Sequence, residues 1–103
     1  MPADDVSIEE AARVLKTLAD PTRLRLIQLL LSMEEGKALC VNALAVRLGV
    51  SQPAVSQHLR VLRHLGLVAP ERRGYRVHYG LNRGRLSSYW EQLEEVLGLD
   101  DEG

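Results

Sequence analysis

The chain has 103 residues, of which 46% are hydrophobic and 26% are charged, and its formal net charge is −1. This length suits one domain, so we expect residues 1–103 to fold as a single unit. The single cysteine excludes an internal disulfide, and no apolar run approaches the ~18 residues of a membrane span. We find no signal peptide and expect a cytoplasmic protein.

The near-neutral net charge hides a strong segregation along the chain. Residues 1–36 carry four basic and seven acidic groups, residues 37–90 carry nine basic and one acidic, and residues 91–103 carry six acidic groups and no basic ones. A middle block with a net charge of +8 can hold a polyanion such as DNA, while the acidic ends face away from it.

Two helices are expected before residue 36. Ser7 and Glu10 have the spacing of a capping box, and the apolar residues that follow recur at helical intervals, which predicts a helix over residues 8–19. Asp20 and Pro21 supply an N-cap and a first-turn proline for a second helix that runs to about Met33. Its apolar residues lie nearly all round, as is typical of a helix at the centre of a small domain.

Residues 41–66 have the pattern of a helix-turn-helix. Gly49 favours the left-handed conformation that ends a first helix, Ser51 can cap the next one and Pro53 fits its first turn. The second helix is then about fourteen residues long and ends at Gly66. Near its start lie side chains of the types that read bases and bind phosphates, namely Gln52, Ser56, Gln57 and Arg60.

Residues 67–82 alternate between apolar and polar side chains, which predicts a β-hairpin, or wing. Arg72, Arg73 and Arg76 surround Gly74 at its tip, and this grouping favours contact with phosphates or a minor groove over a merely solvated turn. Pro70 is expected on an edge strand because it cannot donate to a ladder. A short strand is expected over residues 38–40.

A last helix is expected over residues 84–98, with a wide apolar stripe opposite its glutamates. A terminal amphipathic helix on so small a domain is a natural dimer surface. The expected interface residues on this helix are Leu86, Tyr89, Trp90, Leu93 and Leu97. The fold class predicted is therefore mainly α with a β wing: a winged helix-turn-helix with extra N- and C-terminal helices that form a dimer interface.

Four successive motifs carry a family resemblance. The runs LADPTRLRLIQLL, LCVNALA, GVSQPAVSQHLRVLRHLGLV and RRGYRVHYGLN, which begin at Leu18, Leu39, Gly49 and Arg72, resemble the ArsR/SmtB family of bacterial winged-helix repressors. The likeness covers about residues 8 to 97 and keeps the motifs in the family's order.

The resemblance implies a homodimer paired through the helices at 8–19 and 84–98, with Leu15 on the first of them. It also implies binding to an inverted-repeat operator and release by an effector, often a metal ion. The base-contacting positions of the family correspond to Gln52, Ser56, Gln57 and His58, and its wing contacts correspond to Arg73 and Arg76.

This sequence departs from the family at both of its sensing sites. Where one site has a C-V-C pattern, this chain reads Cys40-Val41-Asn42, and a lone thiolate cannot bind thiophilic As(III) or Cd(II) as two or three do. The other site uses Asp, His, His and Glu, but the matching positions hold no zinc ligand. They are Arg83, Arg85, Val96 and Leu99.

Several alternatives stay open at this point. Cys40 is either a small, partly buried residue or a sensing thiol that is alkylated or oxidised, and the repressor would then respond to metals or thiol reagents. The three histidines do not share a metal-ligand spacing, so no metal site is expected, although one assembled between protomers is an alternative. A protein-binding adaptor on the same scaffold is the alternative function.

An enzyme is disfavoured by the sequence. It has no glycine-rich phosphate loop and no metal triad, and Ser56 and His58 lie two apart on a helix, where side chains do not face each other. We therefore expect no catalytic residues and no cofactor.

Overall fold

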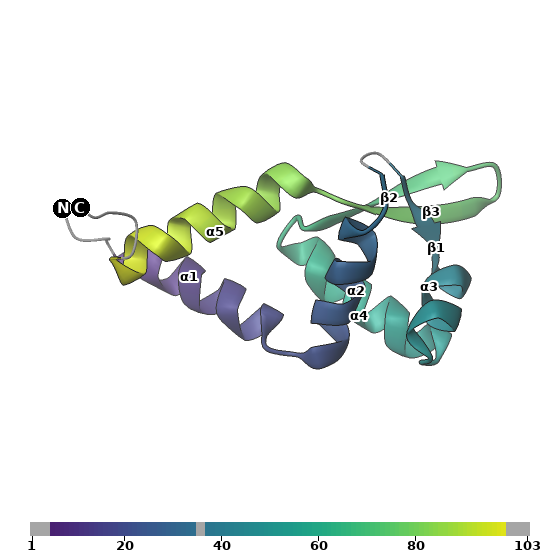
Figure 1. Ribbon diagram of the computed structural model, residues 1–103, viewed down its shortest axis with the longest axis horizontal. Helices are drawn as coiled ribbons and strands as arrows, with labels where there is room; N and C mark the ends of the chain where they lie inside the picture. Colours follow the sequence, from purple (N-terminus) through teal and green to yellow (C-terminus); the bar gives the residue numbers. More distant parts are fainter. Residues whose placement is uncertain (1–4, 35–36, 99–103) are drawn as a thin grey trace.

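The computed structural model describes residues 5–34 and 37–98, which form five helices and a three-stranded sheet (Figure 1). In chain order the elements are α1 (Asp5–Leu18), α2 (Pro21–Leu31), β1 (Leu39–Cys40), α3 (Val41–Leu48), α4 (Gln52–His64), β2 (Val68–Arg73), β3 (Arg76–Leu81) and α5 (Arg83–Leu97). The predicted fold class, a mainly helical winged helix-turn-helix, is confirmed.

The helix starts follow from side-chain caps. The Oδ1 atom of Asp20 accepts the Arg23 N–H at 3.1 Å, and the Oγ atom of Ser51 accepts the Ala54 N–H at 3.2 Å. Each bond satisfies a backbone donor that the first turn leaves unpaired. Gly49 ends α3 with a φ of 70°, a conformation that costs glycine little because it has no Cβ.

Several helix ends differ from the prediction, among them the end of α4, which lies at His64 and not at Gly66. Helix α1 begins at Asp5, so Ser7 lies inside its first turn rather than at its N-cap. Helix α2 ends at Leu31, short of the expected Met33. The guanidinium of Arg83, the first residue of α5, donates to the carbonyls of Leu31 at 3.3 Å and Met33 at 2.7 Å, and so satisfies acceptors that the end of α2 leaves free.

The strands form an antiparallel sheet in the order β1-β3-β2. Strand β1 pairs Cys40 with His78, and Pro70 lies on the edge strand β2, where a missing N–H donor is tolerated. Gly74, with a φ of 68°, begins the turn between β2 and β3. The sheet is a short wing whose three strands all contact the helices: β1 contacts α3, β2 contacts α4, and β3 contacts α2 and α3.

The core lies where α4 crosses the other helices. Val55, Leu59 and Leu62 form the buried face of α4 and are at most 1% exposed. Tyr89 of α5 donates its hydroxyl proton to the carbonyl of Leu65 at 2.7 Å, which ties α5 to the end of α4. These contacts fix which side of α4 faces outward.

Helices α1 and α5 lie side by side and project from the rest of the molecule; we call this pair the arm (Figure 1). The molecule measures 48 × 24 × 20 Å. Its accessible surface of 6895 Å² exceeds the roughly 5,800 Å² expected of a compact monomer of its mass. No helix in the described part of the chain is long and apolar enough to cross a membrane.

Helix α2 is less central than its composition predicts. Leu26, Ile27 and Leu30 are buried, but Leu24 and Leu31 are 51% and 41% exposed. Only one face of α2 therefore belongs to the core of the protomer.

Candidate nucleic-acid interface

The outward side of α4 carries the side chains that the sequence assigned to DNA. Gln52, Ser56, Gln57 and Arg60 are all exposed. They lie outside the buried face formed by Val55, Leu59 and Leu62, which anchors the helix in the core. An anchored helix with an exposed polar face is the arrangement that enters a major groove.

The first of these residues is already held in place. The Nε2 atom of Gln52 donates to the Oδ1 atom of Asn42 at 2.8 Å, across the turn between α3 and α4. Asn42 stood out in the sequence only because it replaces a cysteine of the family's C-V-C pattern. Its amide restricts the rotamers of Gln52 and leaves the Oε1 atom of Gln52 as a free acceptor for a base or backbone partner.

A hollow of about 300 Å³ lies between α4 and the sheet, lined by Ser56, Leu59, Arg60, Arg63 and Tyr79. Arg60 and Arg63 therefore lie on the same side of α4, facing the wing. Arg63 was not among the residues expected from the sequence. Its spacing of seven residues from Ser56, the repeat of one helix face, was the signal that could have found it.

The wing brings three exposed arginines together near its tip. Arg73 pairs with Arg76 across the hairpin, and Arg72 precedes them on β2. The Nη2 atom of Arg73 also makes an ion pair with Glu71 at 2.8 Å. An exposed pair of this kind is worth little, so a phosphate could replace Glu71 as the partner of Arg73.

His58 is placed differently from its neighbours on α4. It is half-buried, and its Nδ1 atom accepts a hydrogen bond of 3.2 Å from the Nε atom of Arg23 on α2. The structure thus directs this side of the imidazole toward the body of the protein.

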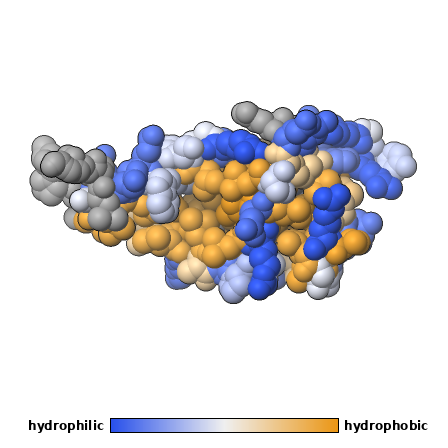
Figure 2. Space-filling model, viewed as in Figure 1, coloured by the Kyte–Doolittle hydropathy of each residue, from blue (hydrophilic) through white to orange (hydrophobic). Residues whose placement is uncertain are grey.

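The arm has an apolar outer face. Ile8 and Leu15 of α1 are 49% and 48% exposed, and Trp90 and Leu97 of α5 are 62% and 59% exposed. Figure 2 shows that apolar side chains gather over α1, α5 and α2 on one side of the molecule. A monomeric protein rarely exposes so many large apolar groups together.

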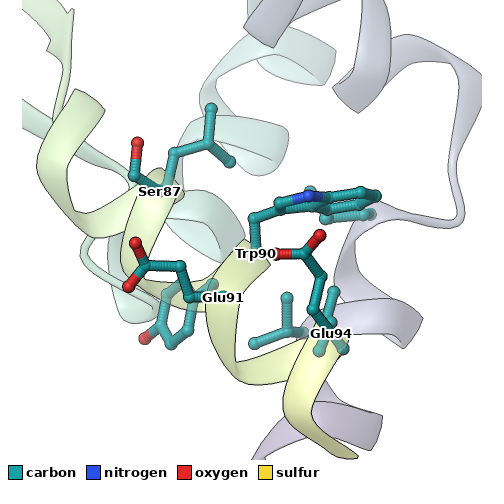
Figure 3. Close-up of a pocket in the computed structure, with 9 residues that line it drawn as sticks. Ser87, Trp90, Glu91 and Glu94 are labelled. Atoms are coloured by element: carbon teal, nitrogen blue, oxygen red, sulfur yellow. The ribbon is translucent and has the colours of Figure 1, made fainter. Parts of the chain in front are cut away.

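A pocket of about 490 Å³ opens within this face, between α1 and α5. Its apolar lining comes from Val14, Leu18, Leu86, Tyr89, Trp90 and Leu93. Figure 3 shows Trp90 and Glu94 extending together from one side of α5, with Ser87 and Glu91 on its other side. The pocket is therefore an apolar hollow edged by carboxylates.

Two of the residues expected at a dimer interface are instead buried within the protomer. Tyr89 is 7% exposed and Leu93 is 5% exposed, because α1 and the end of α4 cover that part of the α5 stripe. Leu86 is partly buried against the same core. Leu15, Trp90 and Leu97 are the predicted contacts that remain largely exposed.

Comparisons with known proteins agree with this geometry. Residues 20–69 match the family described as "Bacterial regulatory protein, arsR family". A "probable mercury resistance operon repressor" of Streptomyces lividans is 39% identical over 93 residues, which cover 90% of this chain and 70% of that protein.

The chain belongs to the arsR family of bacterial regulatory proteins. An ArsR-like transcriptional regulator from Rhodococcus sp. RHA1 superposes with a TM-score of 0.74 at 28% identity, covering 88% of this chain and 82% of that one. A homodimeric winged helix-turn-helix DNA-binding domain from Mycobacterium bovis superposes with a TM-score of 0.69 at 25% identity, covering 99% and 94%. The resemblance drawn from the sequence is confirmed, and the protein is a transcriptional regulator and not an enzyme.

Two of the four positions matched to the family's Asp, His, His and Glu site, Arg83 and Arg85, make other contacts here. Arg83 closes the end of α2, and the Arg85 guanidinium lies 5.9 Å from the centre of the Tyr89 ring. Leu99, the fourth matching position, lies outside the described residues. Within residues 5–34 and 37–98, no group of three or more His, Cys, Asp or Glu side chains is placed to hold a metal ion.

At the site where the family has a C-V-C pattern, this chain retains only Cys40, a free and partly buried thiol at the N-cap of α3. The backbone N–H of Ala43 has the largest effect on the pKa of this thiol and lowers it. Desolvation opposes the shift, and the N–H of Asn42 and the guanidinium of Arg76 add to it. The start of a helix and a nearby cation both favour a thiolate.

We expect Cys40 to be alkylated by iodoacetamide faster at pH 7 than an ordinary thiol, because a lowered pKa increases the thiolate fraction. Arg76→Ala should shift the rate profile to higher pH, since it removes one of the groups that stabilise the thiolate. Arg72→Ala, which removes an equal charge from the same hairpin, should leave the profile in place. Mass spectrometry of quenched samples measures the rates, and identical profiles for all three proteins would contradict this assignment.

Proposed function

We propose that this protein is a homodimeric repressor that binds an inverted-repeat DNA operator through α4 and the wing. The observation that carries the proposal is the orientation of α4, whose apolar face is buried while Gln52, Ser56, Gln57 and Arg60 face outward. Glutamine matches the donor and acceptor of adenine in the major groove, and arginine matches guanine. Arg73 and Arg76 of the wing supply cations for the adjacent backbone.

The arm is the proposed dimer interface. Its outer face exposes Leu15, Trp90 and Leu97, and it lies away from the wing (Figure 1). The Mycobacterium bovis neighbour is itself described as homodimeric. A two-fold axis through the arm would place two copies of α4 about one helical turn of DNA, ~34 Å, or more apart on one side of the duplex. An effector that prefers the conformation without DNA would release the repressor.

The roles of α4 and the wing are separable by substitution. Duplexes enriched from a random pool supply the test DNA, and fluorescence anisotropy measures affinity for them and for scrambled sequences. Gln57→Ala should lower the preference for the enriched sequence by ~1–3 kcal/mol for each base pair that it no longer reads. Arg73→Ala should weaken binding to all sequences alike, and should make the slope of log K against log salt shallower by ~0.9 for each phosphate that the wing no longer neutralises.

Arg13→Ala is the matched control for Arg73→Ala. Arg13 is an exposed arginine on α1, outside α4 and the wing, and helical spacing places it on a different side of α1 from the exposed Ile8 and Leu15. Its removal changes the net charge equally but should leave both the dimer and the salt slope unchanged. If Gln57→Ala kept the full sequence preference and Arg73→Ala kept the full affinity, the proposed DNA-binding surface would be wrong.

A further inference from the structure

Arg23 of α2 makes hydrogen bonds to both α1, which belongs to the proposed dimer interface, and α4, the proposed recognition helix. Its Nη1 atom donates to the carbonyl of Thr17 at the end of α1 at 3.0 Å. Its backbone N–H donates to Asp20 at 3.1 Å, and its Nε atom donates to the Nδ1 atom of His58 on α4 at 3.2 Å. All three bonds are partly buried, and the last spans 35 residues of sequence.

The bond from Arg23 to His58 determines which ring nitrogen of His58 acts as the acceptor. A guanidinium only donates, so the Nδ1 atom of His58 must be the unprotonated acceptor, and the Nε2 atom carries the proton. Asp20 lies close to both partners. The backbone N–H of Arg23 has the largest effect on the pKa of the Asp20 carboxyl and lowers it. Desolvation opposes the shift, and the guanidinium of Arg23 and the N–H of Thr22 add to it. The carboxylate therefore stays ionised at neutral pH and balances the guanidinium.

The apolar contacts of α4 decide which of its sides is buried, but they restrain small rotations about the helix axis less than a directional bond does. Its buried face consists of Val55, Leu59 and Leu62, whose aliphatic contacts hold the helix close but are not directional. A hydrogen bond has a preferred angle and fixes rotation about the helix axis. His58 is the next residue after Gln57, so a rotation of α4 that broke the bond from Arg23 would move Gln57 relative to the DNA.

We infer that Arg23 is a positioning residue for DNA recognition, which sets the orientation of α4 relative to the arm and uses His58 as its acceptor. The inference rests on the proposed function, since it requires that α4 reads the operator. It assigns His58 a role inside the protein and not at a base. In a dimer joined through the arm, the same contact from each protomer sets the relative orientation of the two recognition helices.

The two atoms of His58 can be tested separately. His58→Asn keeps an acceptor near the position of Nδ1, whereas His58→Gln places its amide near the position of Nε2. We expect His58→Asn to stay within about twofold of the wild type in affinity for the enriched duplex. His58→Gln, His58→Ala and Arg23→Ala should each bind about tenfold more weakly. Because Arg23 and His58 act as one pair, the double alanine variant should be no weaker than either single variant.

Arg25→Ala is the control, because Arg25 is an exposed arginine of the same helix and should be dispensable. The slope of log K against log salt should be unchanged in Arg23→Ala, since the Arg23 guanidinium is bonded to Thr17 and His58 and on this account contacts no phosphate. Titration with excess DNA gives the active fraction of each protein. This separates misfolding from weaker binding, and the His58 series carries the test if Arg23→Ala does not fold.

Four results would overturn the inference. If His58→Gln kept the affinity and His58→Asn reduced it, the Nε2 atom of His58 would be the group that matters. A shallower salt slope in Arg23→Ala would make Arg23 a phosphate contact. If every variant matched a wild type that binds the operator, the positioning role alone would fail, whereas a wild type that binds no DNA would defeat the proposed function as well.

Discussion

Trp90→Glu is expected to convert the dimer to a monomer and to lower the affinity for palindromic DNA at least about a hundredfold. Trp90 is 62% exposed on the arm. In a two-fold interface the substitution would bury two unpaired carboxylates, each at a cost of several kcal/mol. Glu91 and Glu94 already edge the same pocket, so the new charge also meets like charges. Sedimentation at micromolar concentration measures the state of assembly.

Val46→Glu is the matched control for this prediction. Val46 is 73% exposed on α3, outside the arm, so the same charge there should leave the dimer intact. If Trp90→Glu stayed dimeric, or if the wild type were monomeric with and without DNA, the arm would not be the interface.

Leu62→Ala is expected to lower the free energy of unfolding by ~2–5 kcal/mol, because it removes buried methyl groups and leaves a cavity. Leu62 is 0% exposed and belongs to the face of α4 that packs on the core. Urea denaturation at equal protein concentration measures the change, since dimer stability depends on concentration. Val46→Ala, at a 73% exposed position, should change it by less than ~0.5 kcal/mol. A decrease below about 1 kcal/mol in Leu62→Ala would show that α4 is not anchored as described.

The helix-turn-helix was predictable because its boundaries depend on local chemistry. Gly49 and Ser51 act through their own backbone conformation and through a cap that reaches only three residues along the chain. The start of α1 was predicted wrongly because the prediction rested on a local pattern alone. The Ser7 and Glu10 pattern is compatible with a helix interior as well as a cap, and here the helix extends further toward the N-terminus.

The α5 stripe shows what helical spacing leaves undetermined. Periodicity placed Tyr89, Trp90 and Leu93 on one broad apolar face, but the position of α1 and the Leu65 carbonyl decides which of them become buried. Tyr89 and Leu93 serve the core, while Trp90 remains outside.

The polar contacts between residues far apart in the chain were also not predicted from the sequence. The bond between Arg23 and His58 joins residues 35 apart, and the bond between Gln52 and Asn42 crosses the turn of the helix-turn-helix. Neither follows from composition or spacing, because each depends on how the helices cross. The sequence therefore named most of the exposed polar groups on α4, while only the structure shows which of them are held in place.

Selection of binding sites from a pool of random duplex DNA tests the central claim most directly. If α4 of a two-fold dimer reads DNA, the wild type should enrich an inverted repeat with half-site centres at least one helical turn, about 10–10.5 base pairs, apart. Gln57→Ala should enrich the same repeat with one or more positions relaxed. Recovery of unselected DNA by the wild type, with no repeat enriched, would contradict the account and favour a winged-helix adaptor that binds protein.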